Sequence, residues 1–171
     1  MASWFTSITK LQHITVVPEG IAEDKVVDLL HRHEFYLQCN PHMTNFEKTE
    51  TPAEKPTIPD DRDATAIAEA QCYKVTDKVH TIPGGLWDSN VVSNYEFLDV
   101  KDGVFVRIHS PLNTTMETLW QVRTTEDGKI ELVENVVIKC SKLLVGTIKD
   151  MCESGWKGIH EMMMKKLQSE A

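Results

Sequence analysis

Glu134 is the residue that the sequence marks most clearly for chemistry. Alternate residues of a strand face the same side of a sheet. In the segment 130–140, one such face consists of Ile130, Leu132, Glu134, Val136, Ile138 and Cys140. Glu134 is the only charged member of this apolar face, and burial there would raise the pKa of its carboxyl group and suit it to general acid or base catalysis. The alternatives are a structural pair with an inward Arg or Lys, or a bulged strand that leaves Glu134 in water.

Arg107 and His109 are two further catalytic candidates, because they share one face of the segment 104–110. The opposite face is apolar and is expected to lie in the core, which would place Arg107 and His109 outside. They would line a site only if the polar face of a curled sheet were the inner one. An inward Arg107–Glu134 pair would be either a structural bridge or a pair that polarises a substrate carbonyl.

Aromatic side chains provide candidates for an apolar ligand site. Trp120 shares a strand face with Met116 and offers a large apolar wall with one N–H donor. Trp120 as an ordinary core residue is an equally good interpretation. Tyr73 and Tyr95 could supply hydroxyl groups. For Tyr73, a structural link with Asp77 is the alternative. For Tyr95, either face of its strand could be the inner one.

The segment 141–168 predicts one long terminal helix. Its apolar face would consist of Leu144, Ile148, Met151, Gly155, Ile159, Met162 and Met163. Glycine within a helix costs about 1 kcal/mol relative to alanine, so Gly146, Gly155 and Gly158 suggest a close approach of the helix backbone to the sheet or to a ligand. Methionine side chains adapt to irregular apolar molecules. Met151, Gly155 and Met162 are therefore ligand-binding candidates, with close packing on a strand as the alternative.

The sequence lacks the motifs of the common cofactor and metal enzymes. It contains no GxGxxG, GxxxxGK[ST], GxSxG or HExxH. His31 and His33 are two residues apart on a predicted helix, so they point about 200° apart and cannot share a metal ion from there. Histidines that complement the helix dipole are the simpler interpretation. We expect neither a metal nor a cofactor.

Turn signals divide the rest of the chain into a strand, a helix and a run of further strands. A strand is predicted over 4–17, a helix over 21–35 that cannot continue past Asn40-Pro41, and a short strand over 43–48. Further strands are expected at 68–80, 85–100, 104–110, 115–125 and 129–140. Pro83-Gly84-Gly85, Asp102-Gly103 and Asp127-Gly128 separate these strands, and Asp-Gly favours tight hairpins. An antiparallel meander follows.

Composition indicates one acidic domain. The 171 residues are 41% hydrophobic and carry a net charge of −8, which argues against nucleic acid and against broad contact with an anionic membrane. Four cysteines without a CxxC pair, no leader and no apolar span predict a cytoplasmic protein with reduced thiols. The segment 47–63 places three prolines among nine charged residues, and we expect a mobile, solvated loop that contributes almost nothing to the core.

The expected fold class is α+β. A curved antiparallel sheet of six to seven strands would wrap around the terminal helix, with one or two short helices after the first strand, because only that helix is long enough to cover one face of the sheet. This helix-grip arrangement, over residues 1–171, resembles an uncharacterised fungal family of START-like domains. The resemblance rests on the segments 5–9 (FTSIT), 29–34 (LLHRHE) with Asn40-Pro41, 73–79 (YKVTDKV) and 82–87 (IPGGLW), and on the long last helix.

The resemblance implies a cavity between the sheet and the terminal helix that holds a hydrophobic small molecule. The first hypothesis is a cofactor-free cyclase or isomerase of fungal specialised metabolism that acts on a polyketide or terpenoid. A pericyclic closure such as a [4+2] cycloaddition would need mainly shape and one or two hydrogen-bond donors. The second is a non-catalytic carrier or sensor of a lipid or metabolite, and the third an interaction module that uses the acidic loop. A second copy of the chain is a further candidate partner.

Overall fold

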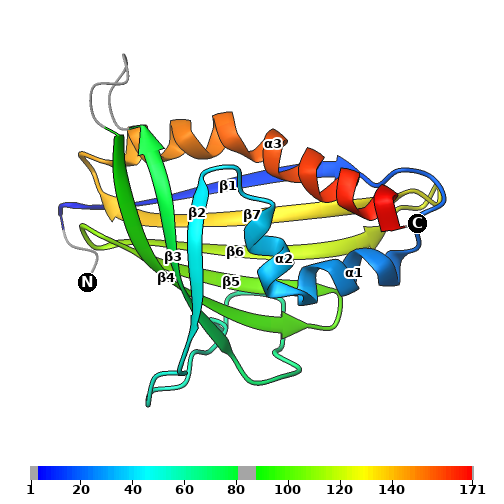
Figure 1. Cartoon of the computed structure of the whole chain (residues 1–171), viewed down its shortest axis with the longest axis horizontal. Coiled ribbons are helices and arrows are strands. Elements are labelled where there is room, and N and C mark those ends of the chain that lie inside the picture. Colours follow the sequence, from blue (N-terminus) through cyan, green and yellow to red (C-terminus); the bar gives the residue numbers. More distant parts are fainter. Residues whose placement is uncertain (1–3, 81–87, 171) are drawn as a thin grey trace.

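The computed structural model describes residues 4–80 and 88–170 (Figure 1). The elements are β1 (Thr6–Val16), α1 (Glu23–His31), α2 (His33–Gln38), β2 (Met43–Thr49), β3 (Gln71–His80), β4 (Asp88–Val100), β5 (Gly103–Ser110), β6 (Thr114–Thr124), β7 (Ile130–Ser141) and α3 (Val145–Glu170). The strands form one sheet in the order β1-β7-β6-β5-β4-β3-β2, and every neighbouring pair is antiparallel.

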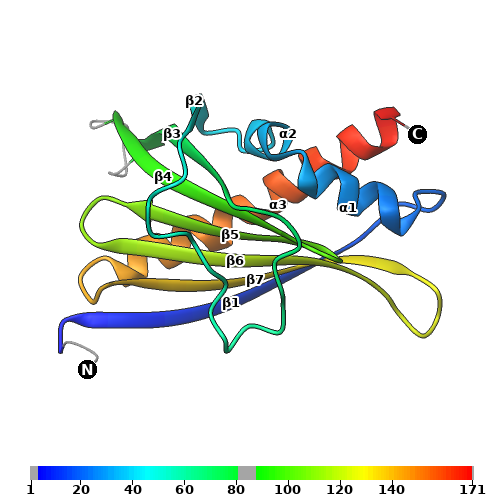
Figure 2. The same ribbon diagram turned by 90° about the horizontal axis from the view of Figure 1, so that it is seen from below.

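The sheet curls around α3, and this confirms the predicted helix-grip fold. Helix α3 runs along the concave face beside β1 and β7, whereas α1 and α2 cross the same face nearer to the end of α3 (Figures 1 and 2). Seen from below, the connection between β2 and β3 loops across the outer, convex face (Figure 2). The concave face is thus the one that helices cover.

The bounds of both predicted helices differ from the prediction. The helix expected over 21–35 is interrupted at Arg32, whose φ of −87° and ψ of 79° are not helical, so that α1 ends at His31 and α2 begins at His33. Helix α3 begins at Val145 rather than at residue 141, because β7 continues to Ser141. The predicted Asp-Gly hairpins are present, whereas the turn expected at Pro83-Gly84-Gly85 lies outside the described residues.

The main core fills the concave side of the sheet. The predicted apolar face of β5 is buried there together with Phe97 of β4, and α1 adds its own apolar stripe with Leu29 and Leu30. Met163 and Leu167 of α3 close this core from above. The alternation of apolar and polar residues in β5 therefore predicted the correct inner face.

A second, smaller core lies on the convex face and involves the segment that was expected to remain solvated. Leu98, Phe105 and Leu119 are buried there, and Ile58 and Ala64 from the β2–β3 connection pack against them. The expectation that residues 47–63 contribute almost nothing to a core is therefore wrong at Ile58. The mobility predicted for this segment stays a prediction.

Candidate functional site

Glu134 lies on the concave face between two histidines from different elements. It is in β7, directly opposite His13 of the edge strand β1 in the register of the sheet. Oε2 of Glu134 is 2.8 Å from Nδ1 of His13 and 3.2 Å from Nε2 of His160 of α3. The side chains of His13, His160 and Glu134 are 4%, 2% and 12% exposed. Residues from β1, β7 and α3 thus form one buried polar cluster, the Glu134 cluster.

The hydrogen bonds define the proton positions in this cluster. Because the carboxylate can only accept, His13 Nδ1–H and His160 Nε2–H both donate to it. With that tautomer, Nδ1 of His160 accepts the hydroxyl proton of Thr15 at 2.7 Å. Nε2 of His13 lies 3.4 Å from Oε1 of Glu153, whose side chain is 45% exposed. His13 therefore connects the buried carboxylate to a second carboxylate at the surface.

Two opposing effects act on the ionisation of Glu134. Burial raises the pKa of its carboxyl group, but the hydrogen bonds and charges of His13 and His160 outweigh burial, and the net pKa is lowered. For His13, burial lowers the pKa of the imidazole, and the bonds and charges of Glu134 and Glu153 outweigh it, so the net pKa is raised. The site therefore favours an ionised carboxylate, contrary to the raised pKa that burial alone would produce.

One oxygen of Glu134 remains available. Both hydrogen bonds to the carboxylate end on Oε2, and Oε1 accepts none from the residues that the structure describes. Oε1 is also in contact with solvent. Every fully buried side-chain oxygen of the described residues has a hydrogen-bond partner, and Oε1 has none, so Oε1 is not fully buried. Glu134 can thus accept a proton at Oε1 while the two imidazoles hold Oε2 in place.

Aromatic rings surround the Glu134 cluster. Trp156 of α3 stacks on His13, with ring centroids 4.6 Å apart and planes 8° apart. Trp120 of β6 is opposite Glu134 in the sheet, and its Nε1–H donates to the hydroxyl of Tyr36 of α2 at 2.9 Å. Burial raises the pKa of Tyr36 well above its usual value, so the hydroxyl keeps its proton. No acceptor for that proton exists among the described residues, which leaves Tyr36 as a donor beside the cluster.

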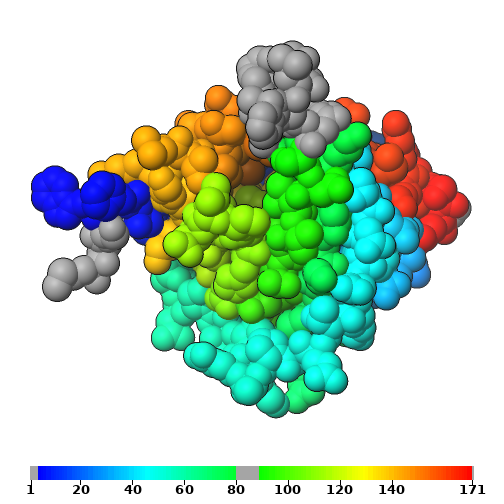
Figure 3. All heavy atoms as spheres, turned by 60° about the vertical axis from the view of Figure 1, so that its left-hand side comes forward, coloured from blue at the N-terminus to red at the C-terminus, as the bar shows by residue number. Residues whose placement is uncertain are grey.

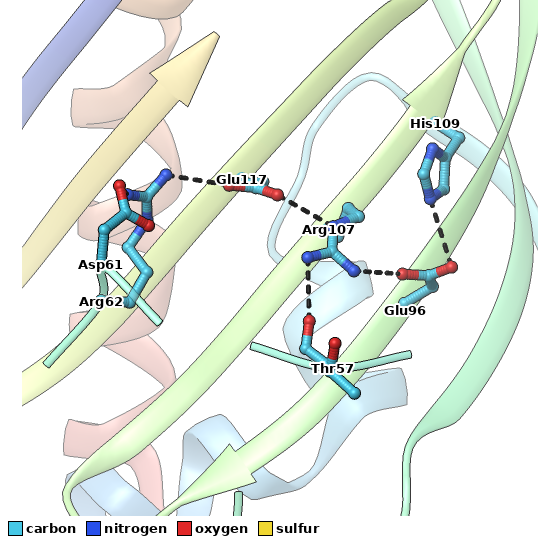
Figure 4. Close-up of polar contacts among 7 residues, drawn as sticks. All are labelled: Thr57, Asp61, Arg62, Glu96, Arg107, His109 and Glu117. Carbon is cyan, nitrogen blue, oxygen red and sulfur yellow. Dashed lines mark hydrogen bonds and ion pairs between the residues drawn. The ribbon is translucent and has the colours of Figure 1, made fainter. Parts of the chain in front are cut away.

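Arg107 and His109 do not join Glu134. Both lie on the convex face, where Arg107 donates to Glu117 at 2.9 Å and to Glu96 at 3.2 Å, and Nε2 of His109 is 3.2 Å from the same Glu96 (Figure 4). The apolar face of β5 occupies the inner side instead, so the inward Arg107–Glu134 pair considered above does not form. The polar side of the curled sheet is its outer side.

This outer ion-pair network holds the β2–β3 connection. Arg62 pairs with both Asp61 and Glu117, and Arg107 also donates to the backbone oxygen of Thr57 at 2.9 Å (Figure 4). Each charged group in the network thus has an opposite charge or a backbone partner. A catalytic role for Arg107 or His109 stays a prediction, and it would require a site on the convex face.

Four of the predicted ligand-binding residues are on the concave side. Trp120, Tyr73 and Tyr95 are buried in the main core, and Met116 packs between that core and a smaller cluster of β7 residues that α3 covers. Tyr95, rather than Tyr73, forms the Tyr–Asp link, since its hydroxyl is hydrogen-bonded to Asp77. Burial raises the pKa of both tyrosines, and they stay neutral.

The predicted ligand-binding residues of α3 are less favourably placed. Met151 and Met162 are 43% and 38% exposed and lie outside the inward face of α3. The other apolar side chains of the predicted face do pack against the cores, namely Leu144, Ile148, Ile159 and Met163. Gly155 is half-buried, but a Cβ atom added there would meet nothing within 4 Å. The close approach of the helix backbone to the sheet inferred for these glycines is therefore wrong, whereas an approach to a ligand stays a prediction. A ligand-binding role for Met151, Gly155 and Met162 stays a prediction.

His13 and His160 were not among the predicted site residues. His13 alternates with Leu11 and Thr15 in β1 and with Val17 directly after it, and this alternation could have predicted that His13 points inward. His160 follows Cys152 and Trp156 at steps of four residues, which is the spacing of one helix face. The two periodicities would have predicted that both imidazoles point inward, but not that they meet Glu134.

Two hollows of the surface lie away from the Glu134 cluster. One, of about 470 Å³, is on the convex side between the β2–β3 connection and Leu98. The other, of about 780 Å³, lies between α1 and the last turns of α3, near Arg32, Leu167 and Glu170. No group of three or more His, Cys, Asp or Glu side chains that could hold a metal ion occurs among the described residues. The ligand cavity expected beneath α3 stays a prediction.

Comparison with solved structures defines the class of the fold. The chain is similar to the Zhui aromatase/cyclase from Streptomyces sp. R1128, with a TM-score of 0.66, 11% identity, and coverage of 95% of this chain and 94% of the other. It is equally similar to the di-domain ARO/CYC StfQ from the steffimycin biosynthetic pathway, with a TM-score of 0.66 and 11% identity. That match covers 95% of this chain but only 51% of the other. Human STARD10 matches with a TM-score of 0.53 and 10% identity, over 96% of this chain and 71% of the other. These are START-like proteins of the polyketide cyclase fold.

The particular family is shown by the sequence itself. Residues 6–169 match the model of the domain of unknown function DUF7053, so the chain belongs to that family. No curated protein matches the sequence. The comparisons thus establish the fold and the family, and the chemistry has to be argued from the residues.

Proposed function

We propose that the protein binds a hydrophobic small molecule of polyketide or terpenoid type between the sheet and α3, and that it catalyses a cyclisation or isomerisation without a cofactor. The observation that carries the proposal is the ionised, buried Glu134, which two imidazoles hold at Oε2 and leave accessible at Oε1. Its side chain retains 12% exposure beneath a helix, which supports a space next to it. We further propose that the protein is cytoplasmic and serves fungal specialised metabolism.

The proposed reaction uses Glu134 as the base and Tyr36 as the hydrogen-bond donor. Glu134 Oε1 removes a proton from a carbon next to a carbonyl group, and the electron pair moves onto the carbonyl oxygen, where the Tyr36 hydroxyl stabilises the enolate. In a cyclisation, the enolate carbon then bonds to a second carbonyl carbon of the same molecule, the π electrons of that carbonyl move onto its oxygen, and Glu134 returns the proton to this oxygen. In an isomerisation, Glu134 returns the proton to a different carbon of the enolate system. A pericyclic closure such as a [4+2] cycloaddition is the variant that needs only the Tyr36 donor and the shape of the site.

Similar proteins support this direction. Two of the similar structures are named aromatase/cyclases, and their fold is that of this chain. The residues around the proposed site are mainly apolar or aromatic, as an apolar ligand requires. A carrier that binds the same molecule without changing it is the second candidate function, favoured by the fold similarity to STARD10.

A paired substitution tests the proposal. Purified protein is incubated with synthetic poly-β-ketone chains of different lengths, and binding and product formation are followed by fluorescence and mass spectrometry. Glu134→Gln is expected to keep binding within about threefold and to lower the cyclisation rate at least 100-fold, within the range for loss of a general base. Glu131→Gln, in the same strand but paired with Arg123 on the other face, is the control and should leave the rate unchanged. Binding with an unaltered rate in Glu134→Gln would favour the carrier.

A further inference from the structure

We propose that one end of the molecule docks on an anionic lipid bilayer. This end comprises the start of β1, the β7–α3 turn and the β5–β6 turn, and we call it the β1 end. The four most exposed large hydrophobic side chains of the described residues all lie there: Leu143 (92%), Trp4 (89%), Phe5 (80%) and Leu112 (73%). Single exposed apolar side chains are common on protein surfaces, but a group of them at one end is typical of an interaction surface.

The β1 end is continuous across the neighbouring strands. Lys142 donates its backbone N–H to the oxygen of Phe5 at 2.9 Å, and Leu143 follows directly. Ile8, which is 59% exposed, is opposite Lys139 in the sheet, and Lys139 is opposite Thr115, just after the turn that contains Leu112. In Figure 3, which looks onto this end, the blue start of the chain projects from the body beside the orange start of α3.

The charges of this end suit an anionic surface. Lys10, Lys139, Lys142 and Lys149 are exposed there, and none of them forms an ion pair with a described residue. In contrast, the arginines at 32, 62, 107 and 123 all pair with carboxylates. Asp150 is the exposed carboxylate next to Lys149. The net charge of −8 led us to expect no broad contact with anionic membranes, but the local charge at the β1 end has the opposite sign.

A bilayer fits these features better than a protein partner. Tryptophan and phenylalanine with leucines at protruding turns can enter the headgroup region, while lysines around them contact anionic lipids. No described helix is long and apolar enough to cross a membrane, so this contact would be peripheral. A recess between the first turns of α3 and β4 opens at the same end (Figure 3). A docked molecule would therefore turn this recess towards the lipid, from which an apolar ligand could enter without crossing water.

Vesicle flotation of the full chain tests the proposal. Two kinds of vesicle are compared at low and high salt. One contains phosphatidylcholine alone, and the other contains about 30% phosphatidylserine to resemble an anionic leaflet. Binding is expected with the anionic vesicles and should weaken with salt. Each lysine near such a surface contributes about 1 kcal/mol, or roughly fivefold in affinity. Lys139→Glu with Lys142→Glu should therefore weaken binding at least tenfold, and Trp4→Ser with Leu143→Ser should do the same at all salt concentrations.

Matched controls separate local from general effects. Lys101→Glu changes the net charge by the same amount as one of the reversals but lies in the β4–β5 turn, and Ile67→Ser removes a side chain that is 60% exposed elsewhere. Both should bind as the wild type does. Wild-type protein that stays unbound with anionic vesicles, or β1-end variants that bind like the controls, would overturn the proposal. A protein-binding role for this end would give the first of these results. The assay requires no activity, so it is independent of the proposed reaction.

Discussion

His13 and Glu134 face each other across β1 and β7, and the imidazole Nδ1–H donates to the carboxylate Oε2 over 2.8 Å. This bond ties the edge strand of the sheet to its interior through a charged group. His160 adds α3 to the same oxygen at 3.2 Å. A polar link of this kind positions three elements relative to one another, and its ionisation should affect both stability and activity.

Glu134→Gln is expected to lower the free energy of unfolding by about 1–3 kcal/mol at pH 7, because two hydrogen bonds to a charged acceptor weaken. The pKa of Glu134 in the folded protein lies below its usual value of 4.5. Its ionised form therefore stabilises the fold above that value, and the stabilisation is lost as the pH falls through the lowered pKa. Urea unfolding should show a smaller difference between wild type and variant at pH 3 than at pH 7. An equal difference at both values would contradict an ionised carboxylate.

His13→Gln should show the opposite pH dependence. The pKa of His13 is raised above 6.5 in the folded protein, so its charged form stabilises the fold below that pH, and this contribution is lost as the pH rises through the raised pKa. The destabilisation caused by His13→Gln should thus be larger at pH 5.5 than at pH 9. Thermal unfolding of both proteins in buffers across this range provides the measurement. A loss of stability that is the same at all pH values would mean that His13 acts only by packing on Trp156.

Thr15→Val tests the second imidazole. It removes the hydroxyl that donates to Nδ1 of His160 at 2.7 Å and leaves that buried nitrogen without its donor. We expect a loss of about 1–3 kcal/mol in the free energy of unfolding. Thr9→Val is the control, since Thr9 is in the same strand with the same orientation, and no described side chain bonds to its hydroxyl. Equal losses in the two variants would show that the Thr15–His160 bond is not important for stability.

Much of the fold could be predicted from local patterns. Alternation separated the two faces of β5 and β7, and the structure places Val104, Val106 and Ile108 in the core and Glu134 among apolar neighbours. Asp-Gly pairs marked two hairpins, because glycine allows a backbone conformation that tight turns need, as at Gly128 with a φ of 80°. These features depend on residues close together in the chain.

The site could be predicted only in part, because its parts are far apart in the sequence. Glu134 was expected, but the two groups that set its pKa are 121 and 26 residues away. Their meeting depends on the strand order, which brings β1 beside β7. The phase of α3 was similarly ambiguous, since Met162 and Met163 are adjacent and equally apolar, and only packing decides that Met163 is buried.

Arg62→Ala is expected to loosen the β2–β3 connection without affecting the Glu134 cluster. Arg62 joins that connection to Glu117 of β6 at 2.9 Å, and its side chain is only 14% exposed. Hydrogen exchange of the backbone amide of Ile67, which donates to Asp99, should accelerate about tenfold, as expected for a loss near 1.4 kcal/mol in local stability. Arg123→Ala is the control, because Arg123 pairs with Glu131 and not with the β2–β3 connection. This variant should leave the exchange of the Ile67 amide unchanged. Accelerated exchange in both variants would contradict a specific anchoring role for Arg62.

Gly103→Ala and Gly155→Ala should have opposite effects, because the space around the two glycines differs. A Cβ atom at Gly103 would collide with the backbone oxygen of Trp120, which the sheet holds in place, so a loss of about 3 kcal/mol or more is expected. At Gly155 a Cβ atom meets nothing within 4 Å, and alanine should stabilise α3 by up to about 1 kcal/mol. Thermal unfolding measures both effects. If Gly155→Ala instead weakened ligand binding while raising stability, the open space at Gly155 would be part of the ligand site; unchanged binding would show that the glycine is dispensable for it.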